Sequence, residues 1–189
     1  MLVGHERKPI VISMSAIPRF KGEEAQAGLM EHDAMQRWID AYEAQADGLI
    51  RFATMMVGSA SAEDIVSDAM IRVLDRPETA RLHQDELAPY LFRAVANTAK
   101  NHLRSSRRRR QREEAVAREP HPASRDTMID PSVSHAIAAL SPQQRAVIFL
   151  TYWSDLHPTA VADHLGVSAG TVKRQLARAR TTLGKALAR

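Results

Sequence analysis

Residues 159–180 read TAVADHLGVSAGTVKRQLARAR, and this stretch decides the fold of the C-terminal part of the chain. A short helix from Pro158 to Leu165 is predicted to end at Gly166, because glycine suits the left-handed conformation at a helix C-terminus. Ser168 is predicted to cap a final helix with one apolar face. Two helices joined by such a tight turn predict a helix-turn-helix, which lays its second helix in the major groove of DNA.

The second helix of this motif carries polar and basic side chains outside its apolar face. Docking in a major groove requires groups that reach base edges and basic groups that reach phosphates. Six basic residues and no acidic residue lie between Ser168 and the C-terminus, which favours DNA binding over the alternative, a helical hairpin with a solvated basic face. The side chains that qualify are Thr171, Lys173, Arg174, Gln175 and Arg178.

Charge is unevenly distributed along the 189 residues, although the net charge is only +4. Residues 22–90 contain 14 acidic and 5 basic residues, whereas residues 93–112 contain eight basic residues and no acid. Such segregation forms positive surfaces for a polyanion and leaves the acidic stretch for a different partner. The two basic blocks, 93–112 and 168–189, therefore predict two contacts with nucleic acid.

Apolar periodicity predicts helices along most of the chain, and no stretch alternates as a strand would. The fold class is therefore all-α, with two small helical domains joined by a flexible linker and the helix-turn-helix in the C-terminal domain. Residues 1–32 are predicted to be a disordered leader, 33–112 the first domain, 113–131 the linker and 132–189 the second domain.

Several helix starts have capping signals. Ser61, with Asp64 three residues later, predicts the start of a helix that stops near Asp75. Ser141, followed by Pro142 and Gln144, predicts another start. A further helix is expected to begin at about Glu86 or Tyr90 and to run into the arginine cluster Arg104–Arg112. Trp38, Tyr42 and Phe52 lie at core spacing, so packing is favoured over base stacking for all three.

The sequence shows no constellation for catalysis, a cofactor or a metal. Cysteine is absent, and the eight histidines are scattered without paired spacing on a helix face. No glycine-rich phosphate loop or nucleophile elbow is present. The expectation is a protein that is not an enzyme and has no cofactor or metal site. The longest apolar stretch, Ala146–Trp153, is too short to span a membrane, so we expect no membrane insertion and a cytoplasmic location.

Two segments resemble a known family. Residues 136–183, AIAALSPQQRAVIFLTYWSDLHPTAVADHLGVSAGTVKRQLARARTTL, resemble the fourth conserved region of sigma factors of the extracytoplasmic-function (ECF) group. Residues 61–74, SAEDIVSDAMIRVL, and 90–110, YLFRAVANTAKNHLRSSRRRR, are similar to the second region of the same family. Both regions occur in the family's order and at its spacing.

The resemblance implies a function in transcription initiation, with core RNA polymerase and promoter DNA as partners. In that family the second region binds the β′ clamp and opens the −10 element, while the fourth region binds the β flap and reads the −35 element. Carried over by position, the polymerase-binding residues are Asp64, Ser67, Asp68 and Ile71. Those at −10 DNA are Asn97, Lys100, Asn101 and Arg104, with an extruded base held around Arg81 to Glu86. Those at −35 DNA are Ser168, Thr171, Lys173, Arg174, Gln175, Ala177 and Arg178.

The resemblance also implies an anti-sigma factor as a partner, because family members are often held by one. The chain departs from the usual family residues at Ser67, Asp68, Leu74, Tyr90, Ala96 and Asn101, which indicates a divergent subgroup. The alternative is a stand-alone helix-turn-helix regulator with an N-terminal helical sensor or dimerisation domain. Such a regulator has no reason to carry the segment SAEDIVSDAM followed by a melting-type helix.

Overall fold

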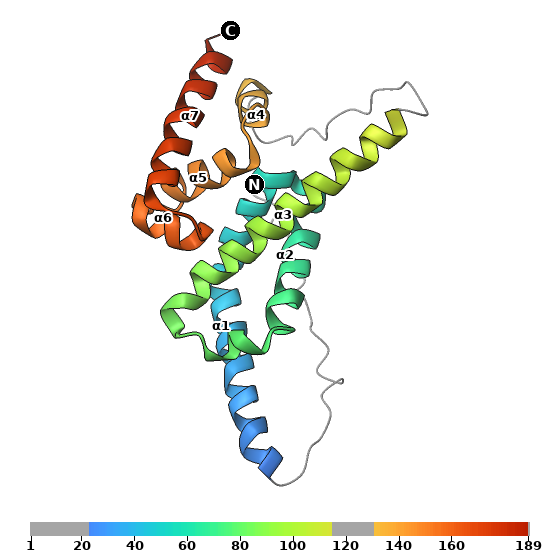
Figure 1. The fold of residues 1–189 in the computed structure, drawn as a ribbon, viewed down its shortest axis with the longest axis vertical. Coiled ribbons are helices and arrows are strands. Elements are labelled where there is room, and N and C mark those ends of the chain that lie inside the picture. The colour runs from blue at the N-terminus through green and yellow to red at the C-terminus, as the bar shows by residue number, and fades with distance from the viewer. Residues whose placement is uncertain (1–22, 115–130, 189) are drawn as a thin grey trace, which may run out of the picture.

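The computed structural model describes residues 23–114 and 131–188, and within these ranges it contains helices and no strand. The predicted all-α fold is confirmed. The first half consists of α1 (Glu23–Val57), α2 (Ser59–Leu74), the 3-10 helix η2 (Pro77–Arg81) and α3 (Gln84–Glu114). The second half consists of α4 (Pro131–Ala138), α5 (Pro142–Tyr152), α6 (Pro158–Leu165) and α7 (Ala169–Leu187). In Figure 1, α3 crosses the molecule and its C-terminal end extends beyond the other helices.

The first half is a bundle of α1, α2 and α3, each of which carries an apolar stripe at helical spacing. Leu49, Phe52 and Met56 of α1 are fully buried. Trp38 packs edge-on against Tyr90 of α3, with ring centroids 5.8 Å apart. The core positions predicted for Trp38 and Phe52 are therefore confirmed.

The junction between α1 and α2 differs from the prediction. Helix α2 begins at Ser59, so Ser61 lies inside the helix and the capping box predicted at Ser61 and Asp64 is wrong. Gly58 is the N-cap residue, with φ 91° and ψ 162°, a conformation that residues with a Cβ atom rarely adopt. The glycine lets the chain turn from one helix into the next within a single residue, so no side-chain cap is needed there.

The outer bounds of the first half also differ from those predicted. Helix α1 begins at Glu23, ten residues before the predicted domain start, because residues 23–32 are rich in good helix formers. Helix α3 begins at Gln84 and continues to Glu114, two residues into the predicted linker. The rest of the predicted leader, 1–22, and most of the predicted linker, 115–130, lie outside the described residues.

The second half follows the predicted local signals closely. Ser141 and Gln144 form a reciprocal capping box at the start of α5. Gly166 ends α6 with φ 63°, and the Val167 amide donates to the Ala162 carbonyl at 3.0 Å. The Ser168 hydroxyl accepts from the Thr171 amide at 3.2 Å. These three predictions are confirmed.

The helices of the two halves share one core. Phe52 of α1 lies 5.3 Å from Phe149 of α5, and Phe92 of α3 lies 5.6 Å from His164 of α6, measured between ring centroids. Helix α6 packs on α3, and α5 packs on α1. The chain regions predicted as two domains are thus in direct contact.

Candidate functional site

The helix-turn-helix consists of α6, the turn at Gly166 and Val167, and α7. Small and branched side chains fill the space between the helices, so packing holds α7 against α6. Ala162 of α6 is buried, and its carbonyl accepts from the Val167 amide in the turn. The buried residues of these helices are Val161, Ala162, Leu165, Val172, Leu176 and Ala179.

The outer surface of α7 brings most of the predicted −35 residues together. We call the exposed side chains Lys173, Arg174, Ala177 and Arg178 the α7 face. Arg174 and Arg178 are four residues apart and project from the same side of the helix. The other three predicted residues, Ser168, Thr171 and Gln175, flank this face.

The side chains of the flanking residues are less available for an outside contact than those of the α7 face. Thr171 and Gln175 are half-buried, because they lie next to the side of α7 that packs into the core. The Thr171 hydroxyl accepts from Arg174 Nη2 at 3.3 Å. Ser168 is exposed, but its hydroxyl is engaged as the helix cap.

A second set of predicted residues forms a row along α3. Asn97, Lys100, Asn101 and Arg104 are spaced at i, i+3, i+4 and i+7, so they share one side of the helix. We call them the α3 row. Lys100 is half-buried while the others are exposed, and burial together with the Arg104 charge lowers the pKa of Lys100. An ammonium that has lost part of its hydration binds a phosphate at a lower desolvation cost.

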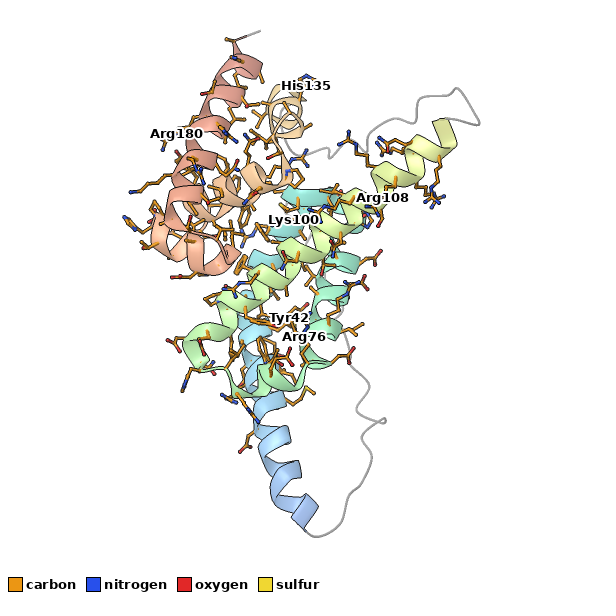
Figure 2. All side chains as sticks on the ribbon, in the orientation of Figure 1. Tyr42, Arg76, Lys100, Arg108, His135 and Arg180 are labelled. Carbon is orange, nitrogen blue, oxygen red and sulfur yellow. The ribbon has the colours of Figure 1, made fainter. Side chains whose placement is uncertain are left out.

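The basic end of α3 continues this row. Arg107 and Arg108 follow Arg104 at helical spacing and are exposed. Figure 2 shows Arg108 on the part of α3 that extends beyond the other helices, with Lys100 nearer the body of the protein. The chain thus presents a cationic helix end that extends beyond the other helices.

The predicted polymerase residues also share one helix side. Asp64, Ser67, Asp68 and Ile71 lie at i, i+3, i+4 and i+7 on α2, and we call them the α2 face. Ile71 is 58% exposed, unusual for so large an aliphatic side chain, while the opposite side of α2 is buried against α1 and α3. Asp68 lies 3.9 Å from Arg72 in an exposed ion pair, which contributes little stability.

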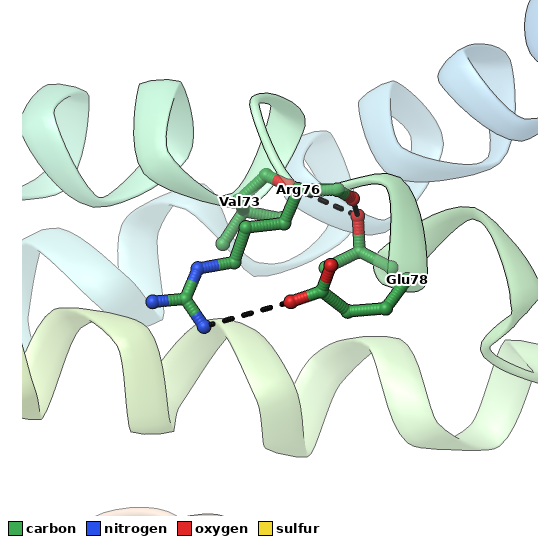
Figure 3. Close-up of polar contacts among 4 residues, drawn as sticks. Val73, Arg76 and Glu78 are labelled. Carbon is green, nitrogen blue, oxygen red and sulfur yellow. Dashed lines mark hydrogen bonds and ion pairs between the residues drawn. The ribbon is translucent and has the colours of Figure 1, made fainter.

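The turn between α2 and α3 is anchored by Thr79. Its hydroxyl lies 2.9 Å from the Val73 carbonyl and 2.6 Å from the Arg76 carbonyl, and an exposed ion pair joins Arg76 and Glu78 at 3.9 Å (Figure 3). The residues 81–86 predicted to hold a base follow directly. The structure places them at the end of η2 and in the first turn of α3, mostly exposed.

One exposed aromatic pair was missed by the sequence analysis. Tyr152 and Trp153, at the end of α5, are 56% and 68% exposed. Trp153 stacks on Phe149, and the Tyr152 hydroxyl accepts two hydrogen bonds from Arg180 of α7. Helical spacing from Phe149 would have placed Trp153 in the core, so the sequence pattern offered no signal of its exposure.

Metal and membrane features were searched over the same described ranges. No group of three or more histidine or acidic side chains in residues 23–114 and 131–188 is arranged to hold a metal ion. Within those ranges, no helix combines the length and apolar character that crossing a bilayer requires.

Comparison with known families matches each half of the fold. Residues 33–109 match the family described as Sigma-70 region 2, and residues 132–183 match Sigma-70, region 4. The chain belongs to the sigma-70 family. Region 2 of this sigma factor coincides with α1 to α3, and region 4 with α4 to α7. A stand-alone regulator does not account for region 2, so that alternative is not favoured.

Relatives place this sigma factor in the ECF group. It is 34% identical over 151 residues to the RNA polymerase sigma-E factor of Streptomyces coelicolor, covering 75% of this chain and 80% of that protein. It is 29% identical over 189 residues to the ECF RNA polymerase sigma factor BldN of the same organism, covering 96% and 70%. The fold resembles the sigma factor RpoE of Bartonella quintana, solved in complex with the anti-sigma factor NepR. That match has a TM-score of 0.59 and 25% identity, and covers 82% of this chain and 96% of the other.

Proposed function

We propose that this sigma factor directs core RNA polymerase to promoter DNA through three separate helix faces. The observation that carries the proposal is that the α2 face, the α3 row and the α7 face are all accessible on one chain that contains both sigma regions. The first face is acidic and apolar, and the other two are basic. Their chemistry fits one protein partner and two stretches of DNA.

The α2 face is the proposed contact with the polymerase β′ clamp. Ile71 offers an apolar side chain that loses its water on binding, and Asp64 and Asp68 beside it supply charge. Burying an exposed aliphatic side chain is favourable by about 1.5–3 kcal/mol. Flanking carboxylates add steering toward a basic partner surface.

The α3 row is the proposed contact with the −10 element. Asparagine side chains can read base edges, while Lys100 and Arg104 carry charge for phosphates. Arg107 and Arg108 extend this charge along the DNA backbone without sequence preference. Residues 81–86, held in place by the Thr79 anchor, are proposed to receive an extruded base, which costs a few kcal/mol to unstack.

The α7 face is the proposed contact with the −35 element, and the same half is proposed to contact the β flap. Arginine can bind guanine through two hydrogen bonds, which gives the pair Arg174 and Arg178 the main role in specificity. Ala177 between them can contact a thymine methyl group. Lys173, Thr171 and Ser168 are proposed to position the helix on phosphates, with Gln175 at the edge of the site.

Two further aspects of this function are proposed by analogy with the relatives. An anti-sigma factor is a proposed partner, because the sigma factor of Bartonella quintana was solved with one. We also propose that this sigma factor acts in the cytoplasm and performs no catalysis itself. The chemistry of RNA synthesis would then belong entirely to the core polymerase.

A selection from random DNA with and without core polymerase tests the proposal. The full chain plus core should enrich fragments that carry two sequence elements at a fixed spacing, and the chain without core should not. Ile71→Lys should abolish this enrichment. Leu187→Lys, at a residue 55% exposed on α7, is the matched control and should retain it. Enrichment of a single element without core would instead indicate a stand-alone regulator.

A further inference from the structure

Three polar side chains at the start of α7 are joined by consecutive hydrogen bonds. The Thr171 amide donates to the Ser168 hydroxyl at 3.2 Å, which fixes the first turn of the helix. The hydroxyl oxygens of the same two residues lie 3.0 Å apart. Arg174 then donates through Nη2 to the Thr171 hydroxyl at 3.3 Å. The helix cap is thus connected, through Thr171, to the guanidinium of Arg174.

Thr171 is well suited to hold a neighbouring side chain. It is half-buried beside the side of α7 that packs into the core, whereas Ser168 and Arg174 are exposed. Its branched Cβ atom restricts rotation about χ1, and its hydroxyl is bonded to that of the capping serine. Thr171 therefore offers Arg174 an acceptor oxygen in a defined position.

The hydrogen-bonding capacity of Thr171 allows this role alongside a phosphate contact. A hydroxyl carries one proton and two acceptor lone pairs. Arg174 occupies one lone pair, and the Ser168 hydroxyl can donate to the other. The Thr171 proton is then left for a phosphate oxygen. Holding Arg174 and positioning α7 on the DNA backbone are therefore compatible.

The bond also leaves Arg174 able to read a base. A guanidinium carries five N–H donors, and Thr171 takes one of them. Because the bond runs from residue 174 back to residue 171, it draws the guanidinium toward the N-terminal turn of α7. The N-terminal residues of a recognition helix are those that contact base edges. The remaining donors are thus held at the end of α7 that would meet the bases.

Arg178, one turn further along α7, has no such restraint. Both arginines are exposed, but the Arg178 guanidinium makes no hydrogen bond or ion pair with any residue in 23–114 and 131–188. A long side chain that is mobile before binding loses conformational entropy when a base orders it. It can also turn to another acceptor, such as a phosphate, when the base is wrong. A held guanidinium is left unpaired by a wrong base, and specificity depends on this difference between right and wrong partners.

We propose that Thr171 is a positioning residue for base readout: it preorganises Arg174, so the base that Arg174 meets is selected more strictly than the base that Arg178 meets. The readout part of this inference rests on the proposed contact of the α7 face with the −35 element. The restraint on Arg174 in the free chain does not depend on that contact. Each part therefore has its own test.

The side-chain motion of Arg174 in the free, full-length chain tests the restraint. NMR order parameters of the arginine Nε–Hε groups report motion on the picosecond to nanosecond timescale. In the wild type, Arg174 should be more ordered than Arg178. Thr171→Val keeps the branched shape and the capping amide but removes the acceptor, so Arg174 should become as mobile as Arg178. Thr171→Ser restores the hydroxyl and should restore the order.

Thr182→Val is the matched control for this measurement. Thr182 is also a half-buried threonine of α7, but its hydroxyl donates to the Arg178 carbonyl at 3.1 Å and bonds no arginine side chain. Its replacement should change the order of neither arginine. Equal order of Arg174 in the wild type and in Thr171→Val would overturn the restraint.

Binding of the holoenzyme to a library of −35 sequences tests the effect on readout. The position that Arg174 meets is the one at which Arg174→Met removes the base preference. Thr171→Val should lower the preference at that position about fivefold, the effect of having to order one long side chain on binding. It should cause no further loss when Arg174 is already methionine. Arg51→Met, at an exposed arginine that donates to the Asp47 carbonyl within α1, controls for loss of one charge and should leave the preference unchanged.

The outcomes of the library measurement separate the two roles of Thr171. If Thr171→Val weakens every sequence alike and leaves the preference intact, Thr171 contacts a phosphate only and the positioning role is wrong. A preference lost in Thr171→Val and regained in Thr171→Ser supports it. If the wild-type holoenzyme has no base preference in the −35 element, the proposed function fails and the readout part falls with it, while the order of Arg174 in the free chain still decides the restraint.

Discussion

Arg178 and Lys173 on α7 are both exposed and basic, but they project in different directions. Arg178 shares a helix side with Arg174, whereas Lys173 projects from a different part of the α7 face. Arg178→Ala should therefore cost about 1–3 kcal/mol of binding on the preferred −35 sequence and relax base preference there. Lys173→Ala should weaken all sequences alike and lower the salt slope by about one unit.

Binding of the holoenzyme across a library of −35 sequences at several salt concentrations measures both effects. The comparison is internal, because each variant is the control for the other. Equal weakening of every sequence by Arg178→Ala would contradict the base-reading role.

His164 lies at the contact between the halves, where its surroundings shift its pKa. Burial lowers its pKa, and Arg93 of α3 lowers it further, while the bond to the Ala160 carbonyl and the Asp163 charge of α6 oppose the shift. A histidine with a lowered pKa stabilises the folded state above its unfolded pKa of about 6.5, and that stabilisation is lost as the pH falls through the folded pKa. The chain should therefore become less stable to unfolding as the pH drops below about 6.5.

Thermal unfolding between pH 8 and pH 5 checks this sign. His164→Leu should remove part of the pH dependence, and His135→Leu, at an exposed histidine of α4, should leave it unchanged. An identical pH profile for the His164 variant and the wild type would rule out this residue as the cause.

At the scale of single helices, the α2 face carries the proposed polymerase contact. Reversing charge at Asp64 and Asp68 together should weaken binding of the full chain to core polymerase about tenfold or more, because both side chains are exposed and place their charge at the proposed contact. Reversing the exposed α1 acids Asp40 and Glu43 makes the same change in net charge and should have little effect. If both double variants bound core polymerase with equal affinity, the α2 face would not be the polymerase contact.

Two glycines predict opposite effects on stability when each is replaced by alanine. Neither position crowds an added Cβ atom, so backbone conformation alone decides. Gly58, at φ 91°, joins α1 to α2, and Gly58→Ala should destabilise the protein by about 1–3 kcal/mol. Gly184 lies within α7, and Gly184→Ala should stabilise it by up to about 1 kcal/mol. Denaturant unfolding of the two variants measures the sign directly.

Helix ends show which parts of the fold the sequence can predict. The starts at Ser141 and Ser168 and the stop at Gly166 were correct, because each depends on atoms within a few residues of chain. The start at Ser61 was wrong although it had a similar local signal. Gly58, three residues earlier, adopts a backbone conformation that ends α1 and starts α2. Helix α2 therefore begins before Ser61 and packs against α1.

At the scale of the whole molecule, the contact between halves was not predictable from the sequence. Arg93 and Asp163 are 70 residues apart, and Arg145 and Met56 are 89 residues apart. In both pairs the acceptor is a backbone carbonyl, which every residue has, so no residue type marks the partner. The three helix faces were predictable, because spacing along one helix fixes which side chains share a side.

Run-off transcription tests the account as a whole, because it requires polymerase binding, promoter recognition and melting in one reaction. With core polymerase and a promoter recovered by selection, the full chain should produce transcripts of one length, starting downstream of the two selected elements. Arg174→Ala/Arg178→Ala should strongly reduce them, and Arg51→Met should not. A yield no greater than that of core polymerase alone would contradict the assignment of this chain as a promoter-recognising sigma factor.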